Sequence, residues 1–498
     1  MGYQIGDRLM VDDELCTIKY IGPIREWSTA PAYGVEWDNP KRGKHSGTIS
    51  GIQYFTTRLA NAGSFLKEAK VKGLRRKSFY KALTEIYGDS QQISNSLYLG
   101  AKKIEGLGFD ALNERNRRLH DLKSISLQKE SIYIDFSDEK ERNYFVSQCP
   151  NVISLDLGQN LVSDFNNLCD ALGLMKNLKT LNLSGNHFSR NWDRLNNNNL
   201  TFPNLKSLFL VSCNLNLQGV NSILNCFPGL QVLDLSGNHF QCIDQKLHLP
   251  ESLVTLNLSD NALKSFPQGF EKWNLEELCL ADNDITIIKK RDDFSAAIKN
   301  LNLSNNRISK WAELDILNTS FPYLEALIIH ANPLFTFDET DQSEFYQIIA
   351  RFDGLKVLDG SPLSSDLIKE AELYFVSKIR NGEITYNKDL KRWKHFNESY
   401  VLDNYQNASK KLPRWLDGEL ETITMIYEEK DLTFSISVLS TYTVRYLKGI
   451  ISSKLSKKVL QIKLYRNLGK GLEEIDKEFS QLRDLSINSE NIIYIKSN

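Results

Sequence analysis

Long apolar runs, paired cysteines and catalytic signatures are all missing from this sequence. No stretch is apolar for long enough to cross a membrane, and residues 1–4 do not start a signal-peptide pattern. The 7 cysteines are scattered without C-x-x-C spacing, so we expect reduced thiols in a cytoplasmic protein and no structural metal. A phosphate-binding loop, an H-E-x-x-H pair and a nucleophile elbow are also absent. These gaps predict a protein that is not an enzyme and needs no cofactor.

An excess of charge of one sign is missing as well. The chain has 61 Lys and Arg residues against 62 Asp and Glu residues, and its net charge of −1 gives no general attraction to nucleic acid or to membranes. Basic residues gather only locally, in a second linker that starts at Lys388 and, earlier, in the stretch between Lys67 and Lys81. That stretch is either a solvated linker or an additional attraction for an acidic partner. At 498 residues the chain is too long for one core and predicts about three domains.

A basic turn between two glycines stands near the start of the chain, with the sequence Gly43-Lys44-His45-Ser46-Gly47. The glycines allow a tight turn, and we expect them to leave the amide groups of the turn accessible. A lysine beside such amides offers charge-assisted donors to a carboxyl terminus. The turn therefore predicts a site for the acidic end of a peptide.

This turn resembles the glycine-rich loop of CAP-Gly domains. Glycines and aromatic residues continue in register with that family over residues 1–72, at Gly6, Gly22, Tyr54, Phe55, Gly63 and Phe65. The resemblance implies a small β-barrel that binds the acidic, aromatic-ended tails of tubulin and of microtubule plus-end proteins. It implies that the peptide-binding residues are Gly43, Lys44, His45, Ser46, Gly47 and Tyr54. An ordinary glycine-rich hairpin in an unrelated small barrel is the alternative.

Two positions depart from the CAP-Gly pattern. The family's loop usually has an acidic residue where this chain has Ser46, and a tryptophan is common where this chain has Ala32. Trp27 lies close by in the sequence. These departures predict a weaker affinity for the tail and leave the fold unaffected.

Leucine motifs repeat through the middle of the chain. Leu-x-Leu-x-x-Asn or a near variant returns every 22 to 27 residues, ending at Asn160, Asn186, Cys213, Asn238, Asn261, Asn283, Asn306 and Asn332. This period is typical of leucine-rich repeats, which stack into a solenoid with a parallel sheet on its concave face. The leucines should build one continuous core, and the asparagines should bond backbone groups of adjoining turns. Cys213 can take one place in that ladder as a small, weak donor.

The residues between the leucines should face outward from the concave sheet. They show no cluster of catalytic type, so we predict a protein-binding surface made of Asp156, Asn182, Phe209, Asp234, Asn257, Asn302 and Ile328. A merely solvated scaffold is the alternative. Apolar residues at helical spacing over 366–380 predict a helix that covers the open end of the core.

The pattern changes again after Pro413. Strands expected at 423–427, 434–438, 462–465 and 492–495, with a helix after Thr443, look like a ubiquitin-like β-grasp domain. The sequence ends without a Gly-Gly pair, so we do not expect conjugation. Lys463 stands where ubiquitin readers use an apolar residue. A docking role is the interpretation that fits these features.

The predicted domains are 1–72 (CAP-Gly), 73–118 (basic helical linker), 119–380 (repeats with their cap), 381–417 (linker) and 418–498 (ubiquitin-like). This order resembles the tubulin-folding cofactor E family. The resemblance implies a cytoplasmic, cytoskeleton-associated chaperone that binds α-tubulin. It also implies partnership with cofactors B, C and D, indirect contact with β-tubulin, and a role in assembling and dissociating the heterodimer.

Two other functions stay open. A microtubule plus-end scaffold would carry basic, Ser-rich flanks and long coiled coils, which this chain lacks. An adaptor for a ubiquitin ligase or the proteasome would need an F-box-like segment before the repeats, or an apolar patch in place of Lys463.

Overall fold

The computed structural model divides the chain into two compact units, Met1–Lys394 and His395–Asn498. The residues that it describes are 2–88, 96–99, 102–105, 119–134, 139–188, 192, 195, 200–243, 247–267, 274–288, 297–335, 343–400, 420–427, 429, 432–455, 457–467, 471–488 and 491–497. Among these residues, no helix is long and apolar enough to cross a membrane.

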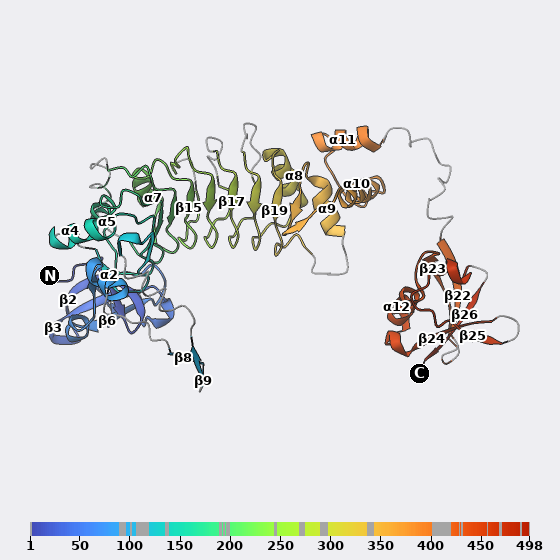
Figure 1. Cartoon of the computed structure of the whole chain (residues 1–498), viewed down its shortest axis with the longest axis horizontal. Coiled ribbons are helices and arrows are strands. Elements are labelled where there is room, and N and C mark those ends of the chain that lie inside the picture. The colour runs from blue at the N-terminus through green and yellow to red at the C-terminus, as the bar shows by residue number, and fades with distance from the viewer. Residues whose placement is uncertain are drawn as a thin grey trace. The chain divides into compact units, whose positions relative to one another are not determined.

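An antiparallel sheet with the strand order β1-β2-β3-β6 forms the first domain (Figure 1, blue). Its alternating strands bury Leu9, Ile18 and Val35 in a small core, and the indole of Trp37 donates to Ser64 Oγ at 3.0 Å. The elements are β1 (Arg8–Val11), β2 (Glu14–Ile24), β3 (Trp27–Trp37), β4 (Thr48–Ile49), β5 (Ile52–Gln53), β6 (Gly63–Lys67) and α1 (Glu68–Lys72).

The leucine motifs form a solenoid, as predicted. Its 11-stranded sheet runs β10-β12-β13-β14-β15-β16-β17-β18-β19-β20-β21, parallel as far as β20 (Figure 1). The strands are β10 (Ser124–Ser126), β12 (Ser154–Asp156), β13 (Thr180–Asn182), β14 (Ser207–Phe209), β15 (Val232–Asp234), β16 (Thr255–Asn257), β17 (Glu277–Cys279), β18 (Asn300–Asn302), β19 (Ala326–Ile328), β20 (Val357–Leu358) and β21 (Ser361–Pro362). The helices of the repeats are α4 (Glu139–Gln148), α5 (Phe165–Leu172), α7 (Leu217–Leu224), α8 (Trp311–Ser320) and α9 (Ser343–Arg351).

Leucines and asparagines hold the repeats together in the predicted way. Leu181 pairs in register with Leu208, which pairs with Leu233, and all three are fully buried. Asn186 Nδ2 donates to carbonyl groups of two adjoining turns, at 2.9 Å each. Cys213 takes the corresponding place, with its Sγ 3.3 Å from the Leu183 carbonyl oxygen. Adjoining turns therefore satisfy each other's backbone groups at these positions, which no isolated repeat could achieve.

Two different helices cover the ends of the solenoid core. At the first end, β7 (Lys77–Ser78) pairs with β11 (Ile132–Tyr133), and α2 (Phe79–Tyr87) adds Phe79 and Leu83 to the core of the repeats. This segment was predicted as a linker, and its described part includes strands as well as a helix. The hairpin β8 (Ser96–Leu99) and β9 (Lys102–Glu105) follows it.

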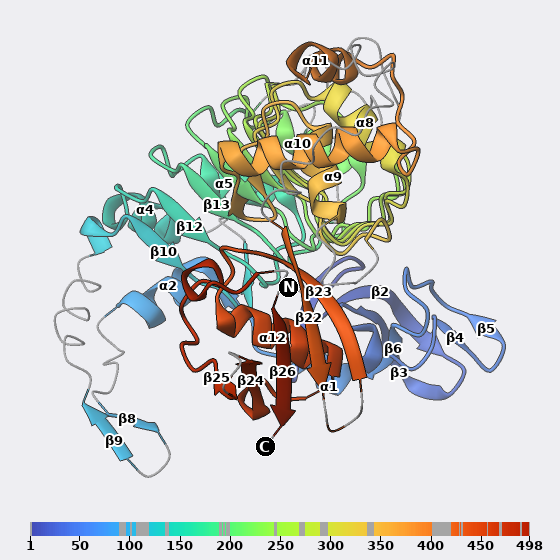
Figure 2. The same cartoon turned by 90° about the vertical axis from the view of Figure 1, so that its right-hand side faces the viewer.

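At the other end, α10 (Ser365–Arg380) lies across the solenoid in Figure 2, as predicted. The helix begins where Ser364 Oγ accepts from the amide of Leu367, and it buries Ala371 and Phe375. After it comes α11 (Lys391–Tyr400), whose Arg392 pairs with Glu372 of α10. Residues 401–417 of the second predicted linker lie outside the described residues.

The second unit contains a five-stranded sheet with the order β23-β22-β26-β24-β25, which is the predicted β-grasp arrangement. Its central strands β22 and β26 run parallel, and α12 packs on the sheet through Val444, Leu447 and Ile451. The elements are β22 (Leu420–Tyr427), β23 (Leu432–Leu439), α12 (Val444–Leu455), β24 (Ile462–Asn467), β25 (Leu472–Glu474) and β26 (Ile492–Ser497). The short strand β25 was not predicted.

Candidate functional site

The basic turn needs both of its glycines. A Cβ on Gly43 would lie 1.9 Å from the carbonyl oxygen of Asn61, and one on Gly47 would lie 2.0 Å from that of Phe55. Gly47 also has φ +96°, a backbone conformation that would be strained in a residue with a side chain. The turn is thus pressed against the chain that follows it.

The prediction that the amide groups of this turn stay accessible is wrong for four of its residues. Lys44 and His45 both donate to the carbonyl oxygen of Gly63, at 2.7 and 3.2 Å. The amide of Gly43 bonds within the preceding helical turn, and that of Gly47 donates to His45 Nδ1 at 3.0 Å. These internal bonds hold the turn against Gly63 of β6. The side chains of Lys44 and His45 are therefore the donors of the turn to consider for a ligand.

The His45 side chain is neutral. Its Nδ1 accepts from the Gly47 amide, so the ring hydrogen resides on Nε2. Burial of the ring lowers its pKa below 6.5, and the charge of Lys44 lowers that pKa further. His45 can therefore donate one hydrogen bond to a carboxylate, while the exposed Lys44 supplies the positive charge.

The Phe65 ring is the centre of an aromatic cluster beside the turn. Ring centroids lie 5.3 to 6.4 Å from it, and the members of the cluster are Tyr20, Trp27, His45, Tyr54, Phe55 and Phe65. Most of the pairs meet edge to face, which favours the ring quadrupoles. Gly34 makes room for Phe55, because a Cβ there would lie 2.5 Å from that ring. The predicted site residue Tyr54 belongs to this cluster.

The tryptophan of this cluster comes from an unexpected position. Trp27 begins β3 and packs against Phe65, whereas Ala32 is fully buried between Gly22 and Lys67 in the sheet. The Lys67 ammonium lies 5.9 Å from the centroid of the Trp27 ring. A cation therefore stands near the Trp27 edge of the cluster, in addition to Lys44 at the turn. Ser46, which replaces the usual acid, accepts the amide of Asn61 at 2.9 Å and braces the turn.

Three other basic residues of the stretch contact the fold, whereas Lys72, Arg75 and Lys81 are exposed. Lys70 pairs with Asp12 at 2.9 Å, and Lys77 pairs with Glu130 at 2.8 Å. The Arg76 guanidinium lies 5.0 and 4.8 Å from the rings of Tyr3 and Tyr133. These contacts tie part of the stretch to the fold, and the charges paired in this way are less available to an acidic partner.

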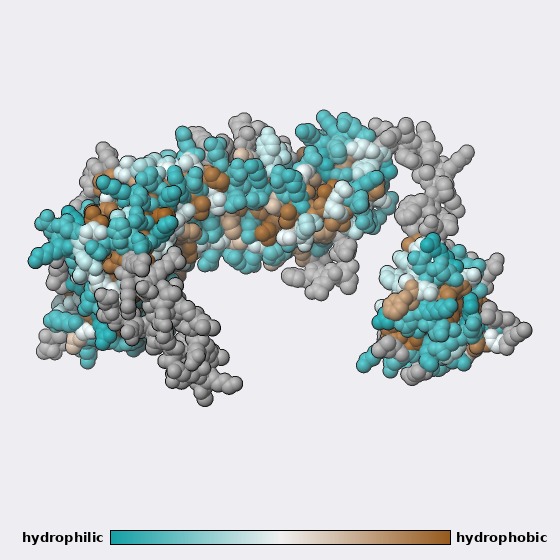
Figure 3. Space-filling view, in the orientation of Figure 1, coloured by the Kyte–Doolittle hydropathy of each residue, from teal (hydrophilic) through white to brown (hydrophobic). Residues whose placement is uncertain are grey.

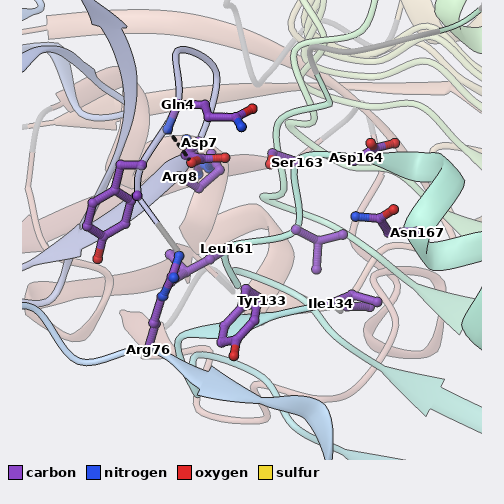
Figure 4. Close-up of a pocket in the computed structure, with 13 residues that line it drawn as sticks. Gln4, Asp7, Arg8, Arg76, Tyr133, Ile134, Leu161, Ser163, Asp164 and Asn167 are labelled. Atoms are coloured by element: carbon purple, nitrogen blue, oxygen red, sulfur yellow. Dashed lines mark hydrogen bonds between the residues drawn. The ribbon is translucent and has the colours of Figure 1, made fainter. Parts of the chain in front are cut away.

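Arg8 joins the first domain to the solenoid. Its side chain is fully buried and binds Asp38 through both guanidinium nitrogens, at 2.6 Å for the first. It also reaches the Gly185 carbonyl oxygen at 3.1 Å, and its Nη1 lies 3.1 Å from His187 Nδ1. The adjacent cavity has a volume of about 460 Å³, and its lining includes Arg8, Arg76 and Asp164 (Figure 4).

Five of the seven residues predicted for the concave face line one groove. This groove has a volume of about 480 Å³ and includes Phe209, Asp234, Asn257, Asn302 and Ile328, together with Cys279. Figure 3 shows apolar residues among polar ones on the solenoid face where β15, β17 and β19 appear in Figure 1.

Asp156 and Asn182 do not line this groove. Their Oδ1 atoms accept the amides of Gly158 and Ser184, so these side chains also support the turns that follow their strands. Asp234 has the same bond to Ser236 and lines the groove as well. Hydrogen bonding to a turn and exposure in the groove are therefore compatible.

Comparisons with known proteins cover the whole chain. The CAP-Gly domain model matches residues 5–71. Protein PAC2 of Saccharomyces cerevisiae is 37% identical over 511 residues, which cover 100% of this chain and 97% of that protein. Tubulin-specific chaperone E of Xenopus laevis is 28% identical over 527 residues, 98% of each chain. This chain belongs to the tubulin-specific chaperone E family.

One of the similar solved structures comes from the same family. The solution structure of the C-terminal ubiquitin-like domain of mouse tubulin-specific chaperone E is 16% identical, with a TM-score of 0.15. It is covered over 88% of its length and corresponds to 16% of this chain.

For this member of the tubulin-specific chaperone E family, sequence reasoning missed two parts of the site. Phe65 was noted only as a residue in register with CAP-Gly domains, and that register was the available signal for its central place. Arg8 belongs to the Gly6-Asp7-Arg8 phrase that opens the CAP-Gly resemblance, but its contact with the solenoid gave no signal, because its partner His187 lies 179 residues away in a repeat. A single contact between residues so far apart in the sequence leaves no repeating pattern from which it could be predicted.

Proposed function

We propose that this protein is a non-enzymatic, cytoplasmic chaperone of tubulin folding, of the cofactor E type. The observation that carries the proposal is the aromatic cluster beside Lys44 and His45, in a chain that aligns end to end with tubulin-specific chaperone E. The rings of the cluster can pack against an aromatic side chain of a peptide. Lys44 and His45 can donate hydrogen bonds to its carboxylates. The acidic, aromatic-ended tail of α-tubulin has both features.

The concave groove is proposed as a second contact, on the folded body of α-tubulin. Its lining mixes Phe209 and Ile328 with Asp234 and the asparagines, a mixture that is usual in protein interfaces. Tethering by the tail raises the effective concentration of the body at the groove, so two weak contacts bind together more tightly than either alone. Cofactors B, C and D, with β-tubulin in the complex, are the proposed further partners in assembling and dissociating the heterodimer.

A capture experiment tests this function. The full chain is immobilised and exposed in separate arms to soluble tubulin with the cofactors, to polymerised microtubules, and to ligase and proteasome subunits. We expect soluble α-tubulin to be retained, and Lys44→Ala to retain less of it. Retention of polymerised microtubules alone would favour a plus-end scaffold, and retention of ligase or proteasome subunits alone would favour an adaptor. Either result would overturn the proposal.

A further inference from the structure

Two exposed aromatic side chains lie on the helix side of the ubiquitin-like domain. Phe479 is 78% exposed and Tyr446 is 55% exposed. Phe479 has the largest exposed fraction among the large apolar side chains that the structure describes. Figure 3 shows apolar residues at the surface where α12 lies in Figure 1. Scattered apolar residues are ordinary at a surface, but two large rings gathered in one place indicate a contact surface.

The backbone holds Phe479 beside the helix. The amide of Arg445 donates to the Glu478 carbonyl oxygen at 2.8 Å, and that of Val444 donates to Ser480 at 3.2 Å. The segment that carries Phe479 is thus bonded to the first turn of α12. The Arg445 guanidinium lies 5.7 Å from the centroid of the Phe479 ring. The backbone that carries the Phe479 ring is therefore in place before any partner arrives, which lowers the entropic cost of binding.

A hollow of about 560 Å³ adjoins the two rings. It is lined by Thr443, Arg445, Tyr446, Gly449, Ile450 and Phe479, which we call the helix-side patch. Gly449 lies within α12, where glycine weakens a helix relative to alanine. A Cβ at Gly449 would meet nothing within 4 Å, so packing inside the chain does not require glycine here. Because Gly449 has no side chain, another molecule can approach the helix backbone closely at this position.

The charge beside the patch is positive. Helix α12 contains Arg445, Lys448 and Lys454 and no acidic residue. Arg445 and Lys448 share the carboxylate of Glu478, at 2.9 and 3.0 Å, so two cations face one anion. Lys454 follows Ile450 by one helical turn, and its ammonium lies 4.9 Å from the Phe434 ring. An acidic partner complements this surface, and a basic one is repelled.

We propose that the helix-side patch binds a short acidic segment of a partner protein, with one apolar side chain of that segment in the hollow beside Gly449. Carboxylates on either side of that side chain would pair with Arg445 and Lys454. A second copy of this domain fits poorly, because it would bring two positive surfaces together. The site differs from the peptide site of the first domain, because it does not need a terminal carboxylate.

The test measures fluorescence anisotropy of a labelled peptide, Gly-Glu-Glu-Phe-Glu-Glu-Gly, with the full chain. The peptide is amidated at its carboxyl end, which removes the group that the basic turn would hold. We expect saturable binding to the wild type and roughly tenfold weaker binding to Phe479→Ser, since central aromatic anchors dominate such contacts. Gly449→Leu should weaken binding similarly by filling the hollow. Gly449→Ala should raise the melting temperature and weaken binding less.

Leu472→Ser is the matched control, because Leu472 is an apolar residue of β25 that is 39% exposed and lies outside the patch. It should bind the peptide as the wild type does, and the melting temperatures of all serine variants should agree. The same peptide with lysine in place of glutamate should not bind. No saturable binding to the wild type, or equal binding to Phe479→Ser, overturns the proposal. So does loss of binding in Lys44→Ala, or a dimer of the wild type that Phe479→Ser abolishes.

Discussion

At the scale of the residue, different groups of the basic turn fix its shape and remain available to a ligand. Its amides are bonded to Gly63 and to His45, which fixes the shape of the turn. The side chain of the exposed Lys44 makes none of the bonds that shape the turn. Because truncating the Lys44 side chain should leave the backbone of the turn unchanged, Lys44 is the residue at which to test peptide binding.

Lys44→Ala should weaken binding of a carboxyl-terminal α-tubulin peptide. A charge-assisted hydrogen bond contributes about 1.5–3 kcal/mol, which corresponds to roughly a tenfold to hundredfold change in Kd. The measurement is a titration with the peptide, both with and without its last aromatic residue. Lys41→Ala is the matched control, since Lys41 is also exposed but precedes the turn. Equal affinity of Lys44→Ala and wild type would remove Lys44 from the site.

His187 should make the stability of the first unit depend on pH. Burial holds the pKa of His187 well below 6.5, and the charges of Arg8, Arg58 and Lys19 lower it further. Its Nδ1 lies 3.5 Å from Asp38, and the Ser212 backbone bond opposes the shift. Below its ordinary pKa the unfolded histidine binds a proton that the folded one refuses, so stability falls as pH falls from 7 to 5.

Urea denaturation of the full chain at pH 7 and at pH 5 measures this effect. His187→Gln keeps an acceptor for Arg8 and cannot be protonated, so it should make the pH dependence smaller. His120→Gln, at an exposed histidine, is the control and should keep the dependence of the wild type. An unchanged pH dependence in His187→Gln would show that the junction does not exclude the proton.

At the scale of the element, periodic structure was predictable and unique contacts were not. Each repeat presents the same leucines to the same neighbours, so the pairing of Leu181 with Leu208 follows from the period alone. Helix α10 was equally readable from the spacing of Ala371 and Phe375. By contrast, α2 joins the solenoid core through Phe79 and Leu83, and the basic residues that precede the helix hide this contact in the sequence.

Leu235 should contribute more to the stability of the solenoid than its neighbour Asp234. Leu235 is fully buried, so Leu235→Ala should cost about 2–5 kcal/mol through lost contacts and a cavity. Asp234 lines the groove, and its carboxylate accepts from the Ser236 amide at 2.9 Å. Asp234→Asn keeps that acceptor and loses only the bond that Oδ2 accepts from Asn257 Nδ2 at 3.0 Å, so it should cost much less than Leu235→Ala. Thermal melts of the full-length variants decide, and a larger cost for Asp234→Asn would contradict the strand register.

At the scale of the whole molecule, the chain offers separate surfaces in separate parts. The aromatic cluster lies in the first domain, the concave groove in the repeats, and the helix-side patch in the second unit. A terminal peptide needs only the first of these. The remaining surfaces are explained if the substrate is a folded protein that is held at several points.

Deleting one domain at a time should therefore impair different steps of the function. Deleting residues 1–72 should weaken capture of tubulin by a factor of roughly 10² or more without abolishing it, because tethering is lost while the groove stays. That deletion also leaves His187 without Arg8, so Lys44→Ala in the full chain is the control that separates loss of tail binding from loss of the junction. Deleting the ubiquitin-like domain from Glu419 should impair heterodimer assembly or dissociation more than tail binding. The measurement is tubulin incorporated into or released from heterodimers with purified cofactors. Full activity of the repeats alone, or of the first domain alone, would contradict joint action of the modules.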